Sequence, residues 1–349
     1  MITNLHHSNS PRASILIIYT GGTLGMDYNE DGVLVPCNFE RILDRVPVLK
    51  ELNINLSVTS FSPPIDSSNV NPEHWVHIGS LVTDNYDNFD GFIVLHGTDT
   101  MAYSASALSF MLQGLSKPVI FTGAQLPIAL PRSDGRENFV TALEIAADRM
   151  EGVPVISEVC IFFNHLLLRG NRSKKVESRH FDAFESENYP VLAEAGIVID
   201  YNFSVLKQYD KAAELTFYSS LSTDILVLKL FPGISEKVVC HSLALEGLRG
   251  VVMESYGSGN VPHQPWFLGL LEKAVNEGVV ILNVSQCDGG NVIQGKYEAS
   301  SALNNLGVIS GRDLTTEAAV TKMMYAIGGY NNPEEIRRCL VQSISGEMD

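Results

Sequence analysis

Short apolar runs alternate with longer amphipathic stretches along most of the chain. Brief apolar runs bounded by Gly, Pro or Asp are typical of buried strands, and apolar positions spaced by three and four residues predict helices. The strands predicted in this way are 15–19, 55–60, 91–95, 118–122, 158–163, 224–230, 250–254 and 279–284. The predicted helices are 39–46, 72–84, 101–113, 138–149 and a long tail from Thr315, with Asn71 as a candidate cap before Pro72.

This order of elements determines the expected fold class. Strands that alternate with helices predict an α/β fold with a doubly wound, mostly parallel sheet. The alternation weakens over 199–217 and then resumes. We therefore expect two doubly wound, mostly parallel α/β domains: a larger N-terminal domain (1–200), a linker (201–220) and a smaller C-terminal domain (221–349).

Composition and charge exclude several classes of protein. The 349 residues include 24 Lys and Arg against 40 Asp and Glu, a net charge of −16, and such a surface repels the phosphates of nucleic acids and of anionic membranes. No apolar run approaches the length of about 20 residues that a membrane span needs, and the polar N-terminus lacks the apolar core of a signal peptide. Five scattered cysteines without a C-x-x-C pair indicate neither a disulfide framework nor a zinc cluster. We therefore expect a reduced, cytoplasmic location.

Two of the predicted strands end in loops rich in Gly and Thr. Strand 15–19 leads into Thr20-Gly21-Gly22-Thr23, and strand 91–95 leads into His96-Gly97-Thr98-Asp99-Thr100. In an open α/β sheet, ligands bind at the carboxyl ends of the strands. Thr23 and Thr98 are therefore candidates for a nucleophilic or water-orienting hydroxyl, and Asp99 for binding a substrate ammonium. A tight Gly turn, and helix capping by Asp99 or Thr100, stay open as simpler interpretations.

The candidate threonines need a base, because a Thr hydroxyl is a poor nucleophile until its proton is removed. The segment 169–175 offers Lys175 as that base, whereas Lys174 is typical of a solvated surface. Upstream, Asp66-Ser67-Ser68 precedes a predicted helix. Hydroxyl-rich loops of this kind bind carboxylates through backbone N–H groups, and a plain helix cap is the equal alternative.

Taken together, these segments resemble the bacterial-type L-asparaginase family, and specifically its cytoplasmic type I branch. The resemblance covers nearly the whole chain and rests first on the two Thr-containing loops. Further matching segments, in the family's order, are Asp66-Ser67-Ser68, Arg132-Ser133-Asp134-Gly135, Arg169-Gly170-Asn171-Arg172 and Ser255-Tyr256-Gly257-Ser258-Gly259-Asn260. The resemblance implies hydrolysis of L-asparagine to L-aspartate and ammonia through a threonine acyl-enzyme, with no metal and no organic cofactor.

The resemblance also implies roles for the residues that act on the reacting amide. Thr23 corresponds to the primary nucleophile. Thr98 corresponds to the second catalytic Thr, with Lys175 as its base. Asp99 would hold the α-ammonium of the substrate.

Further matching residues would bind the other end of the substrate. Ser67 and Ser68 would hold the α-carboxylate, on a loop shaped by Asp66. The family assembles as a homo-oligomer, usually a dimer of dimers. Asn260 matches a position that the C-terminal domain contributes to the neighbouring subunit's site, so that an isolated protomer would have an incomplete site.

One departure from the family pattern concerns the Tyr that polarises the nucleophile. Many relatives place this Tyr after a Gly in the loop 24–36, which we expect to act as a lid. Here Gly32 is followed by Val33, and Val cannot donate a hydrogen bond. Tyr28 lies earlier in the same loop, and Tyr297 matches a Tyr that some type I relatives use from a neighbouring subunit. Tyr297 is slightly favoured.

A second departure concerns activation by asparagine, which some type I enzymes show at a site near the subunit interface. The matching positions are Lys174, Glu254 and Cys287, of which only Cys287 keeps the expected residue type. A carboxylate at Glu254 would repel the carboxylate of a ligand unless Lys174 offset it. We hypothesise that activation is weak, absent or rebuilt, and a clearly sigmoidal dependence of rate on asparagine would count against this.

Three other functions stay open at this stage. The first is broader amide chemistry, either a glutaminase-asparaginase or the related subunit that supplies ammonia for transamidation of charged tRNA. The second is a non-catalytic amino-acid-binding α/β protein, which asparagine-dependent ammonia release would exclude. The third is a nicotinamide oxidoreductase, which the missing G-x-G-x-x-G pattern disfavours.

Overall fold

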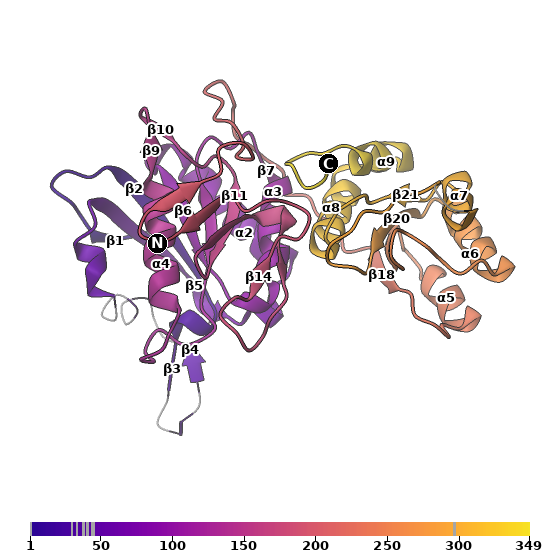
Figure 1. The fold of residues 1–349 in the computed structure, drawn as a ribbon, viewed down its shortest axis with the longest axis horizontal. Helices are drawn as coiled ribbons and strands as arrows, with labels where there is room; N and C mark the ends of the chain where they lie inside the picture. Colours follow the sequence, from indigo (N-terminus) through magenta and orange to yellow (C-terminus); the bar gives the residue numbers. More distant parts are fainter. Residues whose placement is uncertain are drawn as a thin grey trace. The chain divides into compact units, whose positions relative to one another are not determined.

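The chain divides into two compact units, Met1–Phe217 and Tyr218–Asp349 (Figure 1). The computed structural model describes residues 2–28, 31–32, 34–36, 39, 42, 46–295 and 298–349. Of the helix predicted at 39–46, only Phe39, Ile42 and Val46 are described, so most of that prediction lies outside the described residues.

The N-terminal unit is built on a nine-stranded sheet in the order β1-β5-β2-β6-β8-β11-β12-β15-β16. Its central strands β5, β2, β6, β8 and β11 are parallel, and β1, β12, β15 and β16 add to the two edges in antiparallel pairs. The strands are β1 (Thr3–His6), β2 (Ala13–Gly21), β5 (Ile54–Ile65), β6 (Gly91–Leu95), β8 (Val119–Thr122), β11 (Val159–Phe163), β12 (Leu166–Arg169), β15 (Ala193–Ala195) and β16 (Ile199–Tyr201).

Both faces of this sheet are covered. On β2, Ile15 and Ile17 face one core together with Phe139 of α4 (Gly135–Ala147). The alternate residues Leu16 and Ile18 are equally buried on the opposite face, as expected for a parallel strand that is apolar on both sides. The other long helices are α2 (Pro72–Asp84) and α3 (Met101–Met111).

The start of α2 follows the sequence signal closely. Asn71 caps the helix by accepting a hydrogen bond from the His74 N–H, and Pro72 occupies its first turn.

The helix predicted over 101–113 ends earlier than expected, at Met111. Leu112 and Gln113 instead form β7 (Leu112–Gln113), which pairs with β17 (Thr216–Phe217). A partner about a hundred residues away in the chain overrides the local helical pattern here.

The segment predicted as a linker, 201–220, contains parts of two short strands in the structure. Residues 199–201 form the edge strand β16, and 216–217 pair with β7, so the division falls only at Phe217. These strands have two or three residues, too few to show an alternating pattern.

The remaining short elements of the N-terminal unit are two-residue or three-residue ladders and single 3-10 turns. The ladders are β3 (Met26–Tyr28) with β4 (Leu34–Pro36), β9 (Arg149–Met150) with β10 (Val153–Pro154), and β13 (Lys174–Lys175) with β14 (Phe184–Glu185). The 3-10 turns are η1 (Thr23–Gly25), η2 (Pro47–Lys50), η3 (Ser67–Asn69), η4 (Tyr86–Asn88), η5 (Thr98–Thr100) and η6 (Gly170–Arg172).

The C-terminal unit is a smaller α/β layer structure with the parallel sheet β18-β19-β20-β21. Figure 1 shows α5, α6 and α7 on one side of this sheet and α8 and α9 on the other. The strands are β18 (Ile225–Lys229), β19 (Gly250–Ser255), β20 (Val280–Ser285) and β21 (Ile309–Ser310). The helices are α5 (Glu236–Leu243), α6 (Pro265–Asn276), α7 (Glu298–Asn305), α8 (Thr316–Gly329) and α9 (Pro333–Val341). The fold class is therefore as predicted: two α/β domains, the larger one N-terminal.

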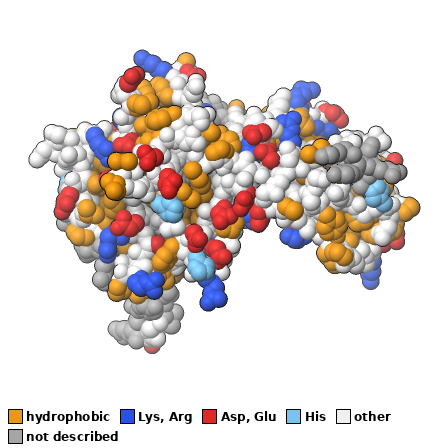
Figure 2. Space-filling model, viewed as in Figure 1, with side chains coloured by type: hydrophobic (Ala, Val, Ile, Leu, Met, Phe, Trp, Pro, Cys, Tyr) orange, Lys and Arg blue, Asp and Glu red, His pale blue; other side chains and the backbone are white. Residues whose placement is uncertain are grey.

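The surface reflects the acidic composition. Figure 2 shows Asp and Glu side chains scattered among apolar and uncharged ones over the viewed face. Among the described helices, none has both the length and the apolar character needed to span a bilayer.

Candidate active site

The two Thr-containing loops meet at the switch point of the N-terminal sheet. Along the chain, β2 is followed by β5 on one side, whereas β6, β8 and β11 follow in turn on the other side. The strand order therefore reverses between β2 and β6, and in open α/β sheets a ligand crevice forms outside the carboxyl ends of two such strands. Thr23 follows β2 and Thr98 follows β6, so both candidates lie where the topology favours a site.

Glycines allow these two loops to touch. Gly22 has a φ of 88°, and a Cβ placed on it would lie 2.5 Å from the Gly97 Cα. A Cβ on Gly97 would in turn lie 2.6 Å from the Ser67 Oγ. Because side chains at either position would collide with backbone or with Ser67, only Gly permits this approach. The half-buried Thr23 and the buried Thr98 each follow one of these glycines directly.

Lys175 connects the second Thr with the neighbouring acid. Its Nζ donates hydrogen bonds to Thr98 Oγ1 at 2.8 Å and to Asp99 Oδ1 at 2.7 Å. The Lys175 side chain is 17% exposed, whereas that of Asp99 is 67% exposed. A mostly buried cation is thus joined to a Thr hydroxyl at one side and to an accessible carboxylate at the other. This arrangement suits proton transfer at Thr98 beside a binding point for a cation.

The loop after β5 supplies a set of hydrogen-bond donors beside this cluster. Asp66 accepts hydrogen bonds from both the backbone N–H and the Oγ of Ser68, each at 2.9 Å, and so holds the η3 turn in shape. Ser67 is buried, and its carbonyl accepts a hydrogen bond from Thr100 Oγ1 at 2.7 Å. The Asp66 side chain does cap η3, while Asn71 caps the following helix α2.

The simpler interpretation of the second loop as a helix cap does not hold. Thr100 stands at the N-cap position of α3 but makes no capping bond with its side chain, and its hydroxyl binds Ser67 instead. Asp99 accepts a hydrogen bond from Lys175. The local sequence favoured capping, but the neighbouring loop and Lys175 offer these side chains partners that lie far away in the chain.

Gln125 is a site residue that the sequence analysis missed. Its Oε1 accepts a hydrogen bond from Thr98 Oγ1 at 3.2 Å, and its Nε2 donates to the His180 carbonyl at 3.0 Å. Its backbone N–H donates to the Asp134 carboxylate, 2.9 Å from Oδ2. A signal was present, because β8 ends in Thr122-Gly123 and leads into a polar loop just as the two recognised strands do.

A series of buried hydrogen bonds supports the end of β6. The Trp75 Nε1 donates to Ser104 Oγ at 2.8 Å, and the same Ser104 Oγ lies 2.9 Å from His96 Nε2. The other ring nitrogen, His96 Nδ1, lies 2.7 Å from the Gly97 carbonyl. A carbonyl only accepts, so Nδ1 carries the proton and the neutral ring accepts the Ser104 proton at Nε2. Burial of the ring lowers the pKa of His96 to about 4, which keeps this chain of donors intact at neutral pH.

We expect His96 to make the fold sensitive to acid. The unfolded chain binds a proton at this residue below about pH 6.5, whereas the folded protein does so only below about pH 4. The unfolded state therefore binds more protons in this window, and the free energy of unfolding falls by up to about 3 kcal/mol as the pH drops through it. Urea unfolding at several pH values measures this slope. His96→Asn should flatten it, and His165→Asn, at an exposed histidine, should not; an equal slope in both would contradict the assignment.

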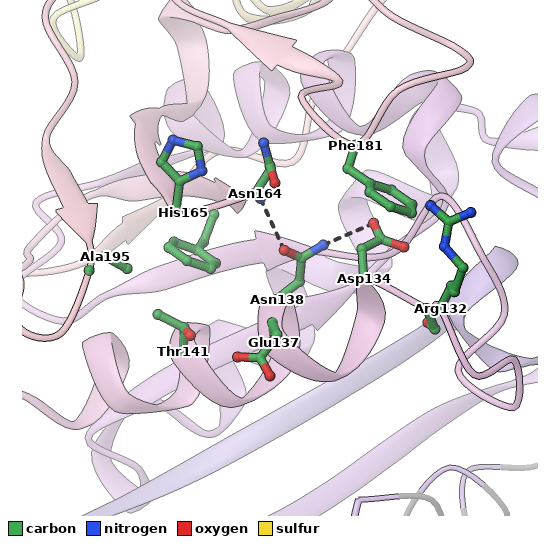
Figure 3. A pocket seen from close by; sticks show the side chains of 12 residues that line it. Arg132, Asp134, Glu137, Asn138, Thr141, Asn164, His165, Phe181 and Ala195 are labelled. Atoms are coloured by element: carbon green, nitrogen blue, oxygen red, sulfur yellow. Dashed lines mark hydrogen bonds between the residues drawn. The ribbon is translucent and has the colours of Figure 1, made fainter.

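A pocket of about 410 Å³ lies between α4 and the turn that joins β11 to β12. Figure 3 shows Asn138 in its wall, donating to Asp134 and accepting from the Asn164 backbone. None of the predicted site residues lines it. Asp134 and Asn138 of the network that reaches Gln125 both line the pocket, whereas Thr23, Thr98 and Lys175 do not.

The remaining predicted site residues are Asn260, Tyr28 and Tyr297. Asn260 lies in the C-terminal unit, in a turn where its backbone N–H donates to the Tyr256 carbonyl at 2.8 Å. Tyr28 is on strand β3, and Tyr297 lies outside the described residues.

Glu254, a proposed effector position, is already engaged within the C-terminal unit. It is buried, accepts a hydrogen bond from Thr316 Oγ1 at 2.6 Å, and pairs with Lys229 at 3.1 Å. A metal site does not emerge either: over the part of the chain that the structure describes, no group of three or more His, Cys, Asp or Glu is placed to hold an ion.

Most of the chain matches known protein families. Residues 14–206 match the family model "Asparaginase, N-terminal", and residues 224–340 match "Glutaminase/Asparaginase C-terminal domain". L-asparaginase 1 of Escherichia coli K12 is 41% identical over 339 residues, which cover 97% of this chain and 98% of that protein.

Two solved structures are similar over nearly their whole length. L-asparaginase I from Vibrio cholerae is 40% identical with a TM-score of 0.88, and the match covers 97% of this chain and 99% of that one. The thermostable L-asparaginase from Thermococcus kodakarensis is 32% identical, also with a TM-score of 0.88, over 96% and 99% of the two chains. The chain therefore belongs to the asparaginase family, and within it to the bacterial type I branch.

Proposed function

We propose that this protein is an L-asparagine amidohydrolase, which releases ammonia and L-aspartate through an acyl-enzyme formed on Thr23. The observation that carries the proposal is the contact of Lys175 Nζ with both Thr98 Oγ1 and Asp99 Oδ1, at 2.8 and 2.7 Å. Family membership supports the choice of substrate.

The proposed substrate lies across the switch point with each end on a different loop. Its α-ammonium binds Asp99, and its α-carboxylate binds the Ser67 and Ser68 donors on the turn held by Asp66. The carboxamide then points to the Thr23 and Thr98 loops, whose close approach through glycine favours two hydroxyls near one carbon. Thr23 Oγ1 attacks the amide carbon, the C–N bond breaks, and the Thr23 proton leaves with the nitrogen as ammonia. Water then attacks the ester: it gives a proton to Thr98 as Thr98 passes its own proton to Lys175, and the ester C–O bond breaks as the Thr23 oxygen regains a proton and L-aspartate leaves.

Substrate binding would also prepare the base. In the free protein, the Lys175 Nζ pairs with Asp99 Oδ1 at 2.7 Å. A substrate ammonium that takes a share of Asp99 places a second positive charge beside Lys175 and favours release of the Lys175 proton. Lys175 is then able to accept the proton of Thr98, so occupation of the site and activation of the base are coupled.

Two features of the proposal reach beyond one protomer. We infer a homo-oligomer, a dimer of dimers in the cytoplasm, in which Asn260 enters the site of a neighbouring subunit and Tyr297 assists Thr23. The Tyr297 hydroxyl is the expected hydrogen-bond donor to Thr23, because Val33 follows Gly32 in the lid loop and cannot donate.

Mixing two inactive variants tests this sharing. Thr23→Ala removes the nucleophile from one domain, and Asn260→Ala removes the contributed side chain from the other. Co-expressed subunits should regain activity, because some sites then combine an intact N-terminal domain with an intact C-terminal domain. Each variant expressed alone is the control. Mixed oligomers that stay as inactive as the single variants would show that each protomer completes its own site.

The alternatives differ in how the structure supports them. Glutaminase activity stays open. Glutamine is longer than asparagine by one methylene, and a pocket discriminates against one methylene by only about 1–3 kcal/mol. A non-catalytic binding protein would not need the mostly buried Lys175 beside a Thr hydroxyl, so this alternative is disfavoured.

A further inference from the structure

The position of Lys175 is not explained by its own strand. The ladder β13–β14 consists of two pairs, Lys174 with Glu185 and Lys175 with Phe184. A two-stranded ladder of this length is marginal by itself. A further bond joins the two segments, from the Val176 N–H to the Ala183 carbonyl at 2.9 Å, so contacts outside the ladder have a large share in holding Lys175 at Thr98.

Tyr189 lies at the point where the two segments are joined. Its ring faces two guanidinium groups, with the Arg169 Cζ 4.3 Å and the Arg172 Cζ 5.0 Å from the ring centroid. Arg172 lies three residues before Lys175, and Tyr189 lies five residues after Phe184. The stack therefore joins the segment that enters the ladder to the segment that leaves it, three residues before the base in the chain.

The stack is anchored to the sheet. Arg169 pairs with the buried Glu158 at 2.5 Å, and both the Arg169 Nη2 and the Tyr189 hydroxyl donate to the Val205 carbonyl, each at 2.9 Å. The Ser173 Oγ donates to the Arg169 carbonyl at 2.6 Å, which fixes the chain two residues before Lys175. Arg172 is only 2% exposed, so its guanidinium has little freedom to leave the aromatic face.

We propose that Tyr189 is a positioning residue for Lys175, which acts through its aromatic face on Arg169 and Arg172. The inference rests on the proposed function, because it matters for catalysis only if Lys175 is the base. Cation–π contacts of desolvated guanidinium groups are worth more than those at the surface. Loss of the ring would free the 172–175 segment, and a displacement of about 1 Å at a catalytic group lowers the rate by about a hundredfold.

Two substitutions distinguish the effect of the Tyr189 ring on kcat from the effect of its hydroxyl. Tyr189→Leu should lower kcat by about tenfold to a hundredfold, with a much smaller change in KM, since Asp99 and the Ser67 loop are untouched. Tyr189→Phe keeps the aromatic face and should retain most of kcat. The matched control is Tyr201→Leu, at another half-buried Tyr of the same unit, whose hydroxyl binds Asp148 at 2.7 Å. This control should keep kcat.

A double-variant cycle gives the decisive readout. In a Lys175→Met background, Tyr189→Leu should cause little further loss, because the residue it positions is gone. An additive loss, or equal kcat for Tyr189→Leu and Tyr201→Leu, would overturn the proposal while leaving the role of Lys175 intact. If Lys175→Met alone kept full activity, the proposed function would fail instead. Should Tyr189→Leu not fold by circular dichroism, Tyr189→Met fills more of the space without an aromatic face and takes its place in each comparison.

Discussion

Replacing Lys175 by Met should lower kcat for asparagine by about three to four orders of magnitude while leaving KM nearly unchanged. The Lys175 Nζ is 2.8 Å from Thr98 Oγ1, and a positioned general base contributes about 10²–10⁴-fold to a rate. Met keeps the length and the apolar stem of Lys but offers no group that accepts a proton. Asp99 stays in place to bind the substrate ammonium, so the loss should appear in kcat. Steady-state ammonia release over a range of asparagine concentrations measures both parameters.

The neighbouring residue provides the control for this experiment. Lys174 precedes Lys175 on the same short strand, so its side chain points to the opposite face. Lys174→Met removes the same charge from the same segment and should keep kcat within a few-fold. A loss as large as that of Lys175→Met would indicate that charge in the segment, and not the contact with Thr98, matters.

Thr98→Val extends the prediction to the partner of the base. Val has nearly the shape of Thr but lacks the hydroxyl that Lys175 and Gln125 contact. If Thr98 and Lys175 act as one unit, the double variant should be about as slow as either single variant. Losses that add in full would show that the two residues serve independent steps.

The fold was predictable where local signals agree with long-range pairing. The apolar run 91–95 appears as β6 with the same bounds, and the Asn71-Pro72 signal marks the start of α2. The antiparallel edge of the sheet was not predictable, because β15 and β16 have three residues each. The strand at 216–217 was not predictable either, because its pairing with β7 depends on residues far away in the chain.

The candidate site was predictable as a set of loops but not as a geometry. The carboxyl ends of β2 and β6 gave Thr23, Thr98 and Asp99, and the structure brings the latter two to Lys175. Sequence reasoning has no access to the burial of Lys175 or to the touching glycines. Gln125 was not predicted because its side chain carries neither a charge nor a hydroxyl, although the loop after β8 follows the same pattern. The catalytic roles stay predictions.

Thr23→Ala should produce the largest loss of all, about 10⁴-fold or more in kcat, because it removes the group that forms the acyl-enzyme. Thr23 is half-buried in the η1 turn directly after the contact between Gly22 and Gly97. Thr20 provides a matched control three residues earlier. It is buried, and its hydroxyl donates to the Leu95 carbonyl at 3.0 Å. Thr20→Val should lower stability by about 1–3 kcal/mol through the unpaired carbonyl, while the folded variant keeps its kcat.

In the proposed function, Thr23 is the nucleophile of an amidohydrolase that acts on asparagine. Ammonia release from L-asparagine by the parent and by Thr23→Ala, with L-glutamine measured alongside, tests this role. We expect turnover of asparagine by the parent and a loss of about four orders of magnitude in folded, oligomeric Thr23→Ala. A folded parent that releases ammonia from neither amide, or a Thr23→Ala variant that retains the parent rate, would contradict it.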